Sequence, residues 1–248
     1  MKCWGMLIGV VLALCAAGGC GNRPVAESIP TYPMMDAKST LHALAERAGQ
    51  VKSLSGEGLI TLTRKDGESV RLDGAVAMRP PERARIRAWK FGRGVFDLTV
   101  TPEGVWMETP DDPKRKERLM SAGLSAAKLA RTWSVLSGGF FDSPGLTTQI
   151  QGERMIARRD IPGEPAVVCE VDRRTLTPRR YSMRDDKGVE RFSLTLGQYR
   201  EFGEAVWPTK LEAVSEGGTV EIELRDVEVN PDLPATAFLP PRRAEKLP

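Results

Sequence analysis

The chain has 248 residues and a formal net charge of +3 at pH 7, with 36 Lys and Arg residues against 33 Asp and Glu residues. The two signs of charge alternate along the chain, so the composition gives no indication of nucleic-acid binding. The sequence has no internal repeat and no long low-complexity block, and its length is sufficient for one domain with a substantial hydrophobic core.

The N-terminal residues predict an exported protein. Lys2 is the only charged residue before an apolar run from Trp4 to Gly19, which is the layout of a secretory signal peptide. A retained membrane-spanning helix is the alternative, but it requires roughly 20 apolar residues, and this run ends at Gly18-Gly19. We therefore expect residues 1–19 to be a signal peptide that is cleaved.

The segment Ala17-Gly18-Gly19-Cys20 resembles the lipobox of bacterial lipoproteins. That resemblance implies lipid attachment at Cys20, which becomes the mature N-terminus, whereas Cys15 follows the bulky Leu14 and is a poorer candidate. Two or three acyl chains anchor a protein stably. Gly21 stands where lipoprotein sorting rules place Asp for inner-membrane retention, so we expect anchoring in the outer membrane, facing the periplasm, with no cofactor besides the covalent lipid.

A linker and a helix are predicted next. Residues 20–35 contain three prolines and few periodic apolar residues, which is typical of an extended linker. Asp36 is a suitable N-cap, and apolar residues at helical spacing from Leu41 to Val51 predict a helix of roughly four turns.

Five antiparallel strands in a meander are predicted between residues 58 and 109. Apolar and polar residues alternate along Val70–Arg79, and Asp66-Gly67 separates this strand from the run at 58–63. Pro80-Pro81, the turn at 92–94 and the turn at 102–104 separate the strands that follow.

An apolar stripe at helical spacing predicts a second helix over Leu124–Phe141, ended by Gly138-Gly139. Six further strands are expected at residues 147–158, 165–173, 178–184, 188–199, 206–215 and 218–229, the last with a bulge near Arg225-Asp226 because its apolar parity changes there. The predicted fold class is α+β: one domain over residues 36–242 with about eleven strands in a single curled antiparallel sheet, an unclosed half-barrel. Two helices are expected to cover its concave apolar face, and residues 243–248 to form a tail.

The sequence offers few groups for catalysis or metal binding. Cys169 would be the only thiol left after processing and lies in a strand-like apolar run, so we expect a buried small side chain rather than a reactive thiol. His42 is the only histidine and has no partner at metal-ligand spacing, so no metal site is predicted. The adjacent pairs Asp111-Asp112 and Asp185-Asp186 are expected in solvated turns rather than in a catalytic dyad. We predict no catalytic residue, although a hydrolase that uses only carboxylates is an open alternative.

Four segments in this order resemble the LolA/LolB-like lipoprotein carrier superfamily: MRPPERARI, TPEGVWMETPDD, VWPTKLEAV and LRDVEVNPDLPATAFLPP. The resemblance covers residues 37–241, and a lipid-anchored member is closer in type to LolB, the outer-membrane receptor, than to the soluble carrier LolA. It implies a half-barrel whose helices form a lid over an apolar cavity for lipoprotein acyl chains.

The resemblance also implies site residues. LolB-type receptors carry an exposed apolar side chain in a hairpin after the third strand, and WKFGRGVF places Phe91 there. The alternative is that Phe91 closes the third strand against the core. The segment KLARTWSVLSGG falls where the family has its lid helix. The candidate cavity residues, which core packing would explain equally well, are Trp89, Phe96, Trp106, Trp133, Leu136, Phe140 and Phe192.

Two hypotheses of function follow. The first is a non-enzymatic outer-membrane lipoprotein that binds acyl chains of lipids or lipoproteins in an apolar cavity and helps to localise lipoproteins, with a periplasmic carrier protein as a candidate partner. The second is an envelope interaction or sensing lipoprotein on the same fold, with its concave face filled by its own side chains.

Overall fold

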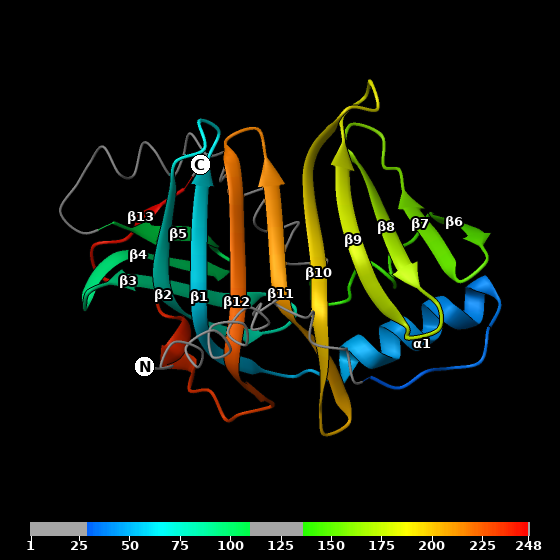
Figure 1. Ribbon diagram of the computed structural model, residues 1–248, viewed down its shortest axis with the longest axis horizontal. Helices are drawn as coiled ribbons and strands as arrows, with labels where there is room; N and C mark the ends of the chain where they lie inside the picture. Colours follow the sequence, from blue (N-terminus) through cyan, green and yellow to red (C-terminus); the bar gives the residue numbers. More distant parts are fainter. Residues whose placement is uncertain (1–28, 110–135, 248) are drawn as a thin grey trace, which may run out of the picture.

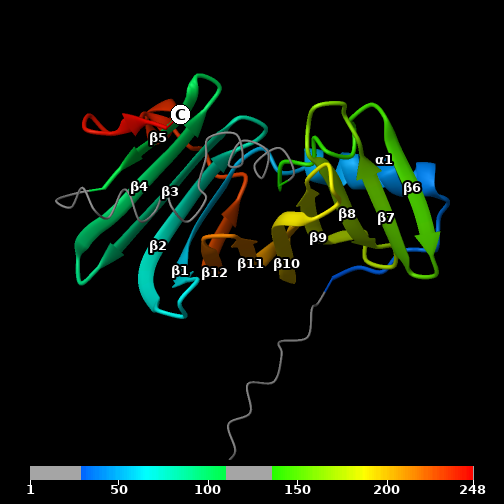
Figure 2. The ribbon, with the colours of Figure 1, turned by 90° about the horizontal axis from the view of Figure 1, so that it is seen from above.

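The computed structural model describes residues 29–109 and 136–247. In this part of the chain, 13 strands form one antiparallel sheet that does not close into a barrel. One α-helix, α1 (Ala37–Gly49), and one short 3-10 helix, η1 (Ala235–Phe238), accompany the sheet. Figure 2 shows that the sheet bends strongly. Its two edge strands, at the two ends of the strand order, lie at opposite ends of the molecule.

The sheet has the order β13-β5-β4-β3-β2-β1-β12-β11-β10-β9-β8-β7-β6 (Figure 1). The strand bounds are β1 (Leu54–Arg64), β2 (Ser69–Arg79), β3 (Arg83–Lys90), β4 (Arg93–Thr101), β5 (Gly104–Glu108), β6 (Leu146–Gln151), β7 (Arg154–Arg159), β8 (Ala166–Asp172), β9 (Thr177–Arg184), β10 (Glu190–Phe202), β11 (Ala205–Ser215), β12 (Gly218–Val229) and β13 (Glu245–Lys246). Two meanders, β1–β5 and β6–β12, are thus joined where β1 pairs with β12. The predicted meander of five strands is confirmed.

The start of α1 follows from its capping residue. The Asp36 Oδ1 atom accepts a hydrogen bond from the Ser39 N–H at 2.9 Å, and this bond lowers the pKa of the Asp36 carboxyl. This bond confirms the predicted N-cap at Asp36. The helix then buries Leu44, 3% exposed, against the sheet.

A bulge lies in the seam between β1 and β12. Glu57 pairs with Asp226 and Gly58 pairs with Leu224, so Arg225 is an extra residue on β12. The predicted bulge is confirmed, and it lets both apolar parities of β12 contribute to one core face.

The sheet has more strands than predicted, because two segments were assigned incorrectly. The single strand expected at residues 147–158 is a hairpin of β6 and β7, turning at Gly152, whose φ is 59°. In the expected tail, Glu245 and Lys246 form β13 by pairing with Met107 and Trp106 of β5. The count is therefore 13 rather than about eleven.

Of the two predicted helices, only the first lies wholly in the described residues. Most of the second, residues 124–135, lies outside them, so the described part does not show two helices over the concave face. Leu136 is helical, and a turn follows it from Ser137, with Gly138 at φ 82°. The helix therefore does not continue to Phe141 as predicted, because glycine at positive φ ends it.

Two large hydrophobic clusters form the core on the α1 side of the sheet, and a third, small cluster of Ile60, Leu72 and Ala88 lies beside the second. The first cluster joins α1 to β7–β11, and the second joins β1–β5 to β11 and β12. Leu136 and Ile222 are partly buried and pack against both clusters. The two clusters therefore meet in the middle of the sheet.

Cys169 lies in the first cluster with no exposed surface. Burial raises the pKa of its thiol well above the ordinary range. We expect a thiol-specific reagent to label Cys169 at least ~100-fold more slowly in the folded protein than in denaturant, because only the exposed thiolate reacts. Labelling followed by mass spectrometry measures this rate, and equal rates in both states would contradict the burial.

Candidate functional site

A pocket of about 60 Å³ lies where the two core clusters meet, beneath the C-terminal half of α1. Its walls come from α1, from the turn after Leu136 and from strands β9, β10 and β11. Most of the wall is apolar; the lining includes Leu44, Val51, Leu136, Phe141, Leu176, Leu196, Val206, Trp207 and Tyr199.

The size of the pocket limits what it holds as it stands. One buried water occupies about 10–15 Å³ by the same measure, so about 60 Å³ corresponds to about four to six water-sized groups. This is enough for a small head group and the first methylenes of a chain. A whole acyl chain enters only if the two clusters separate further.

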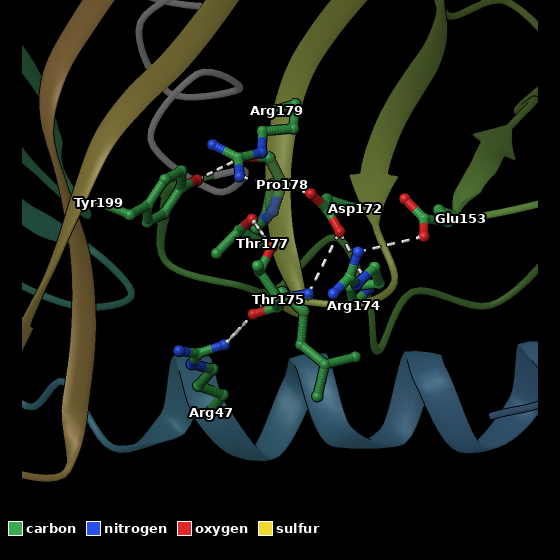
Figure 3. A network of polar contacts seen from close by, with 10 residues as sticks. Arg47, Glu153, Asp172, Arg174, Thr175, Thr177, Pro178, Arg179 and Tyr199 are labelled. Carbon is green, nitrogen blue, oxygen red and sulfur yellow. Dashed lines mark hydrogen bonds and ion pairs between the residues drawn. The ribbon is translucent and has the colours of Figure 1, made fainter. Parts of the chain in front are cut away.

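Arg47 of α1 forms part of the pocket wall, and Figure 3 shows how it is held. Its Nη1 donates to the backbone carbonyl oxygens of Thr175 at 2.5 Å and Leu176 at 3.1 Å. These carbonyls lie in the turn between β8 and β9. The bonds tie the end of the helix to the sheet, and burial lowers the pKa of the guanidinium because it desolvates the charged form.

The turn that receives Arg47 is itself held by polar contacts (Figure 3). Asp172 Oδ1 accepts from the N–H groups of Arg174 at 2.9 Å and Thr175 at 3.2 Å. The Tyr199 hydroxyl donates to the Pro178 carbonyl. Since Tyr199 also lines the pocket, this network fixes the pocket wall from below the helix.

Trp207 of β11 supplies the largest side chain of the lining. It is 6% exposed, and its Nε1 has no hydrogen-bond partner among the described residues. Burial of a hydrogen-bond donor without an acceptor is unfavourable. Neither Trp207 nor Arg47 stood among the predicted cavity residues. Helical spacing places Arg47 on α1, but no sequence signal distinguishes a half-buried arginine from a surface one.

The predicted cavity residues are distributed over several environments. Of the seven, Leu136 lines the pocket. Phe140 is buried in the first cluster and Phe192 packs against it, whereas Phe96 packs against the second. Trp133 lies outside the described residues, as does Cys20.

Trp89 and Trp106 project from the other face of the sheet. Trp106 lies between Val105 and Met107, which belong to the second cluster, and Trp89 pairs with Asp73 next to the buried Leu72. Because successive strand side chains point to opposite faces, neither tryptophan faces the pocket.

Phe91 lies at the tip of the β3–β4 hairpin and is 91% exposed. Lys90 pairs with Arg93, so Phe91 and Gly92 form a two-residue turn, with φ 51° and 74°. Such a turn favours Asn-Gly or Gly-Gly, and an aromatic residue at positive φ costs about 1 kcal/mol. Phe91 therefore does not close the strand against the core, and local backbone preference does not account for it.

The side chains of the types that ligate metals do not form a cluster in the part of the chain that the structure describes. Within 29–109 and 136–247, no group of three or more His, Cys, Asp or Glu side chains could hold a metal ion. His42 is exposed on α1 and lies 3.4 Å from Glu46. Asp185 accepts from the N–H groups of Lys187 and Val189 in the β9–β10 turn; Asp111 and Asp112 lie outside the described residues. No helix in this part of the chain is long and apolar enough to cross a membrane.

Comparison with solved structures gives the fold. A LolA superfamily protein from Nitrosomonas europaea superposes with a TM-score of 0.57 at 13% identity, covering 83% of this chain and 98% of that one. A domain described as an outer membrane lipoprotein-sorting protein from Vibrio parahaemolyticus gives a TM-score of 0.56 at 11% identity, covering 82% and 97%. The chain has a LolA/LolB-like fold. A DUF1329 family protein from Desulfovibrio piger superposes on this chain with a TM-score of 0.60 at 15% identity, covering 83% of this chain and 98% of that one.

The LolA/LolB-like fold is thus detected through structure. The sequence matches no protein-family model and has no significant match among curated proteins. At 11–15% identity these likenesses establish the fold alone.

Proposed function

We propose that this protein is a non-enzymatic carrier of acyl chains in the cell envelope. It is anchored by lipid at Cys20 in the outer membrane, faces the periplasm, receives lipids or lipoproteins from a periplasmic carrier protein and helps to localise lipoproteins. The pocket between the two core clusters carries this proposal. Apolar burial of the acyl chain supplies the binding energy, at about 0.8 kcal/mol per methylene.

Three further observations support the carrier function. The sheet is unclosed, so the clusters can separate without the rupture of a strand ladder. The proteins of similar fold include a LolA superfamily member and a lipoprotein-sorting domain. The exposed Phe91 provides an apolar contact for the membrane.

The small volume of the pocket favours a second candidate. An envelope interaction or sensing lipoprotein on the same fold would need no space for a chain, and about 60 Å³ holds only part of one. Such a protein would bind a protein partner and no lipid.

Native mass spectrometry of residues 21–248 with fatty acids and a diacylated peptide separates the two functions. A carrier gives a stoichiometric bound acyl species, and a clean unliganded mass under saturating ligand favours the sensing protein.

A variant that blocks the pocket gives a sharper result. Val206 lines the pocket, and Val206→Phe places a ring in its space. We expect at least a ~10-fold loss of acyl binding, with a stability cost of about 1–3 kcal/mol from overpacking. Val214→Phe is the matched control, because Val214 lies on the same strand, is 38% exposed and does not line the pocket. Equal binding by both variants would place the acyl chain elsewhere.

A further inference from the structure

Two residues that line the pocket each have a buried side-chain donor without a hydrogen-bond partner in the described part of the chain. Among the described residues, five buried side-chain atoms have no hydrogen-bond partner: Arg47 Nη2, Thr99 Oγ1, Arg173 Nε, Arg184 Nε and Trp207 Nε1. Two of these five belong to pocket-lining residues, Arg47 and Trp207. Buried polar groups in folded proteins nearly always have partners, so each of these two pocket-lining side chains has an unused donor for a ligand oxygen.

The Nη2 group of Arg47 has no hydrogen-bond acceptor among the residues that the structure describes, and the bonds of Nη1 limit how far the side chain can turn to find one. Its Nη1 is held by the carbonyls of Thr175 and Leu176, which fixes the plane of the guanidinium. Arg47 has no ion pair with any described carboxylate; its guanidinium carbon lies 5.5 Å from the centroid of the Tyr32 ring. A half-buried positive charge of this kind is costly until an anionic or strongly polar acceptor reaches it.

The lining residues indicate which kind of ligand the pocket would bind. Both unpartnered groups are N–H donors, so the ligand must present oxygen acceptors, and guanidinium groups pair well with carboxylates. The remaining wall is mostly apolar, so the same ligand must continue as hydrocarbon. The volume fits such a head group and its first methylenes.

We propose that Arg47 and Trp207 bind the acyl oxygen of the ligand, either the carboxylate of a free fatty acid or the ester carbonyl of a lipid. This inference rests on the proposed function, since it identifies which end of the acyl ligand sits beneath α1. The hydrocarbon then extends between the two clusters. The pocket thereby selects for ligands with an acyl head group and not only for apolar length.

A ligand series with one chain length tests the inference in the purified protein. Decanoate, methyl decanoate and decyltrimethylammonium each contain a ten-carbon chain, with the carboxyl carbon counted in the first two, and carry an anionic acceptor, a neutral acceptor and no acceptor, respectively. We expect Arg47→Met to weaken decanoate binding about 10- to 100-fold, as for loss of a hydrogen bond to a charged group. Decyltrimethylammonium binding should not weaken. Trp207→Phe removes the five-membered ring with its N–H and keeps an aromatic ring in place, so decanoate should weaken by about three- to tenfold relative to decyltrimethylammonium, which reports the loss of packing alone.

Arg173→Met is the matched control. Arg173 is also buried, also has an unpartnered Nε and donates to backbone carbonyls, but it does not line the pocket. It should leave the affinities for all three ligands unchanged. Trp207→Phe leaves the bonds of Arg47 to the β8–β9 turn in place, so it tests the inference even if Arg47→Met does not fold.

The outcomes separate the inference from the proposed function. If wild-type protein binds none of the three ligands, the carrier function fails and the inference fails with it. If it binds all three equally, or if Trp207→Phe and folded Arg47→Met both bind decanoate as wild type does, the inference is overturned while the carrier function stands. Decanoate bound more tightly than its methyl ester supports a free fatty acid, and equal affinity of the two supports an ester-linked lipid.

Discussion

The Phe91→Glu variant is expected to deliver bound acyl cargo to membranes about 10 to 100 times more slowly than the wild-type protein. Phe91 is 91% exposed at a hairpin tip, where its ring can enter the apolar part of a bilayer. Insertion of a Phe side chain contributes about 1.5–3 kcal/mol, which corresponds to the expected rate factor if the inserted state precedes release. Glutamate at this position would have to be desolvated. Transfer of a fluorescent diacylated peptide from the protein to vesicles measures the rate.

The control for this prediction introduces the same charge elsewhere. Val189→Glu changes another exposed apolar residue, 48% exposed, before β10 in the other meander, and it should leave the transfer rate unchanged.

Phe91→Asn should slow transfer as well, yet it should raise the free energy of unfolding by up to about 1 kcal/mol, because Asn tolerates positive φ. Wild-type transfer by Phe91→Glu would show that the tip has no role in delivery.

The Gly58→Ala variant is expected to lose about 3 kcal/mol or more of folding stability. A Cβ atom at Gly58 would lie 2.0 Å from the Glu223 backbone oxygen and 2.9 Å from the Leu224 Cα. Both are main-chain atoms at the bulge where β1 meets β12, so relief requires the strands to separate. Urea unfolding followed by tryptophan fluorescence gives the free energy of unfolding.

Gly197→Ala is the strand glycine to compare with it. Gly197 lies in β10 with no atom within 4 Å of its hypothetical Cβ, and we expect a change within about 0.5 kcal/mol. Equal stability of the two variants would mean that the β1–β12 seam tolerates separation and is not a fixed part of the sheet.

Much of the sheet could be predicted because its strands are long and one face is buried. The alternation from Val70 to Arg79 has only one register that places Leu72, Val76 and Met78 in the core, and the structure has this register. The change of parity near Arg225 similarly specified the bulge, since no straight strand buries both Leu224 and the residues that follow. Asp36 identified the start of α1 because its carboxylate has a specific partner in the first turn.

The remaining elements depend on partners far along the chain. Glu245 and Lys246 have no strand pattern of their own and become a strand only through β5. Gly152 gave a local signal, a glycine within a strand-like run, but Gln151 and Glu153 on either side are equally compatible with a continuous strand. The pocket was beyond sequence reasoning for a different reason: a buried apolar side chain has the same sequence pattern whether it touches a neighbour or lines a space, as Phe140 and Leu196 show.

The segment before α1 has a mechanical consequence for an anchored protein. Ile29 and Met35 pack against the first cluster, the Tyr32 N–H donates to the Arg174 carbonyl at 2.6 Å, and Arg173 donates to the Met35 carbonyl. Residues 29–35 are thus fastened to the sheet, although the sequence predicted them as part of the linker. If Cys20 carries the lipid, the tether between membrane and domain is the backbone from residue 20 to residue 29, which spans at most about 30 Å. A tether of this length keeps the domain next to the bilayer, so the domain meets the membrane surface without first diffusing to it.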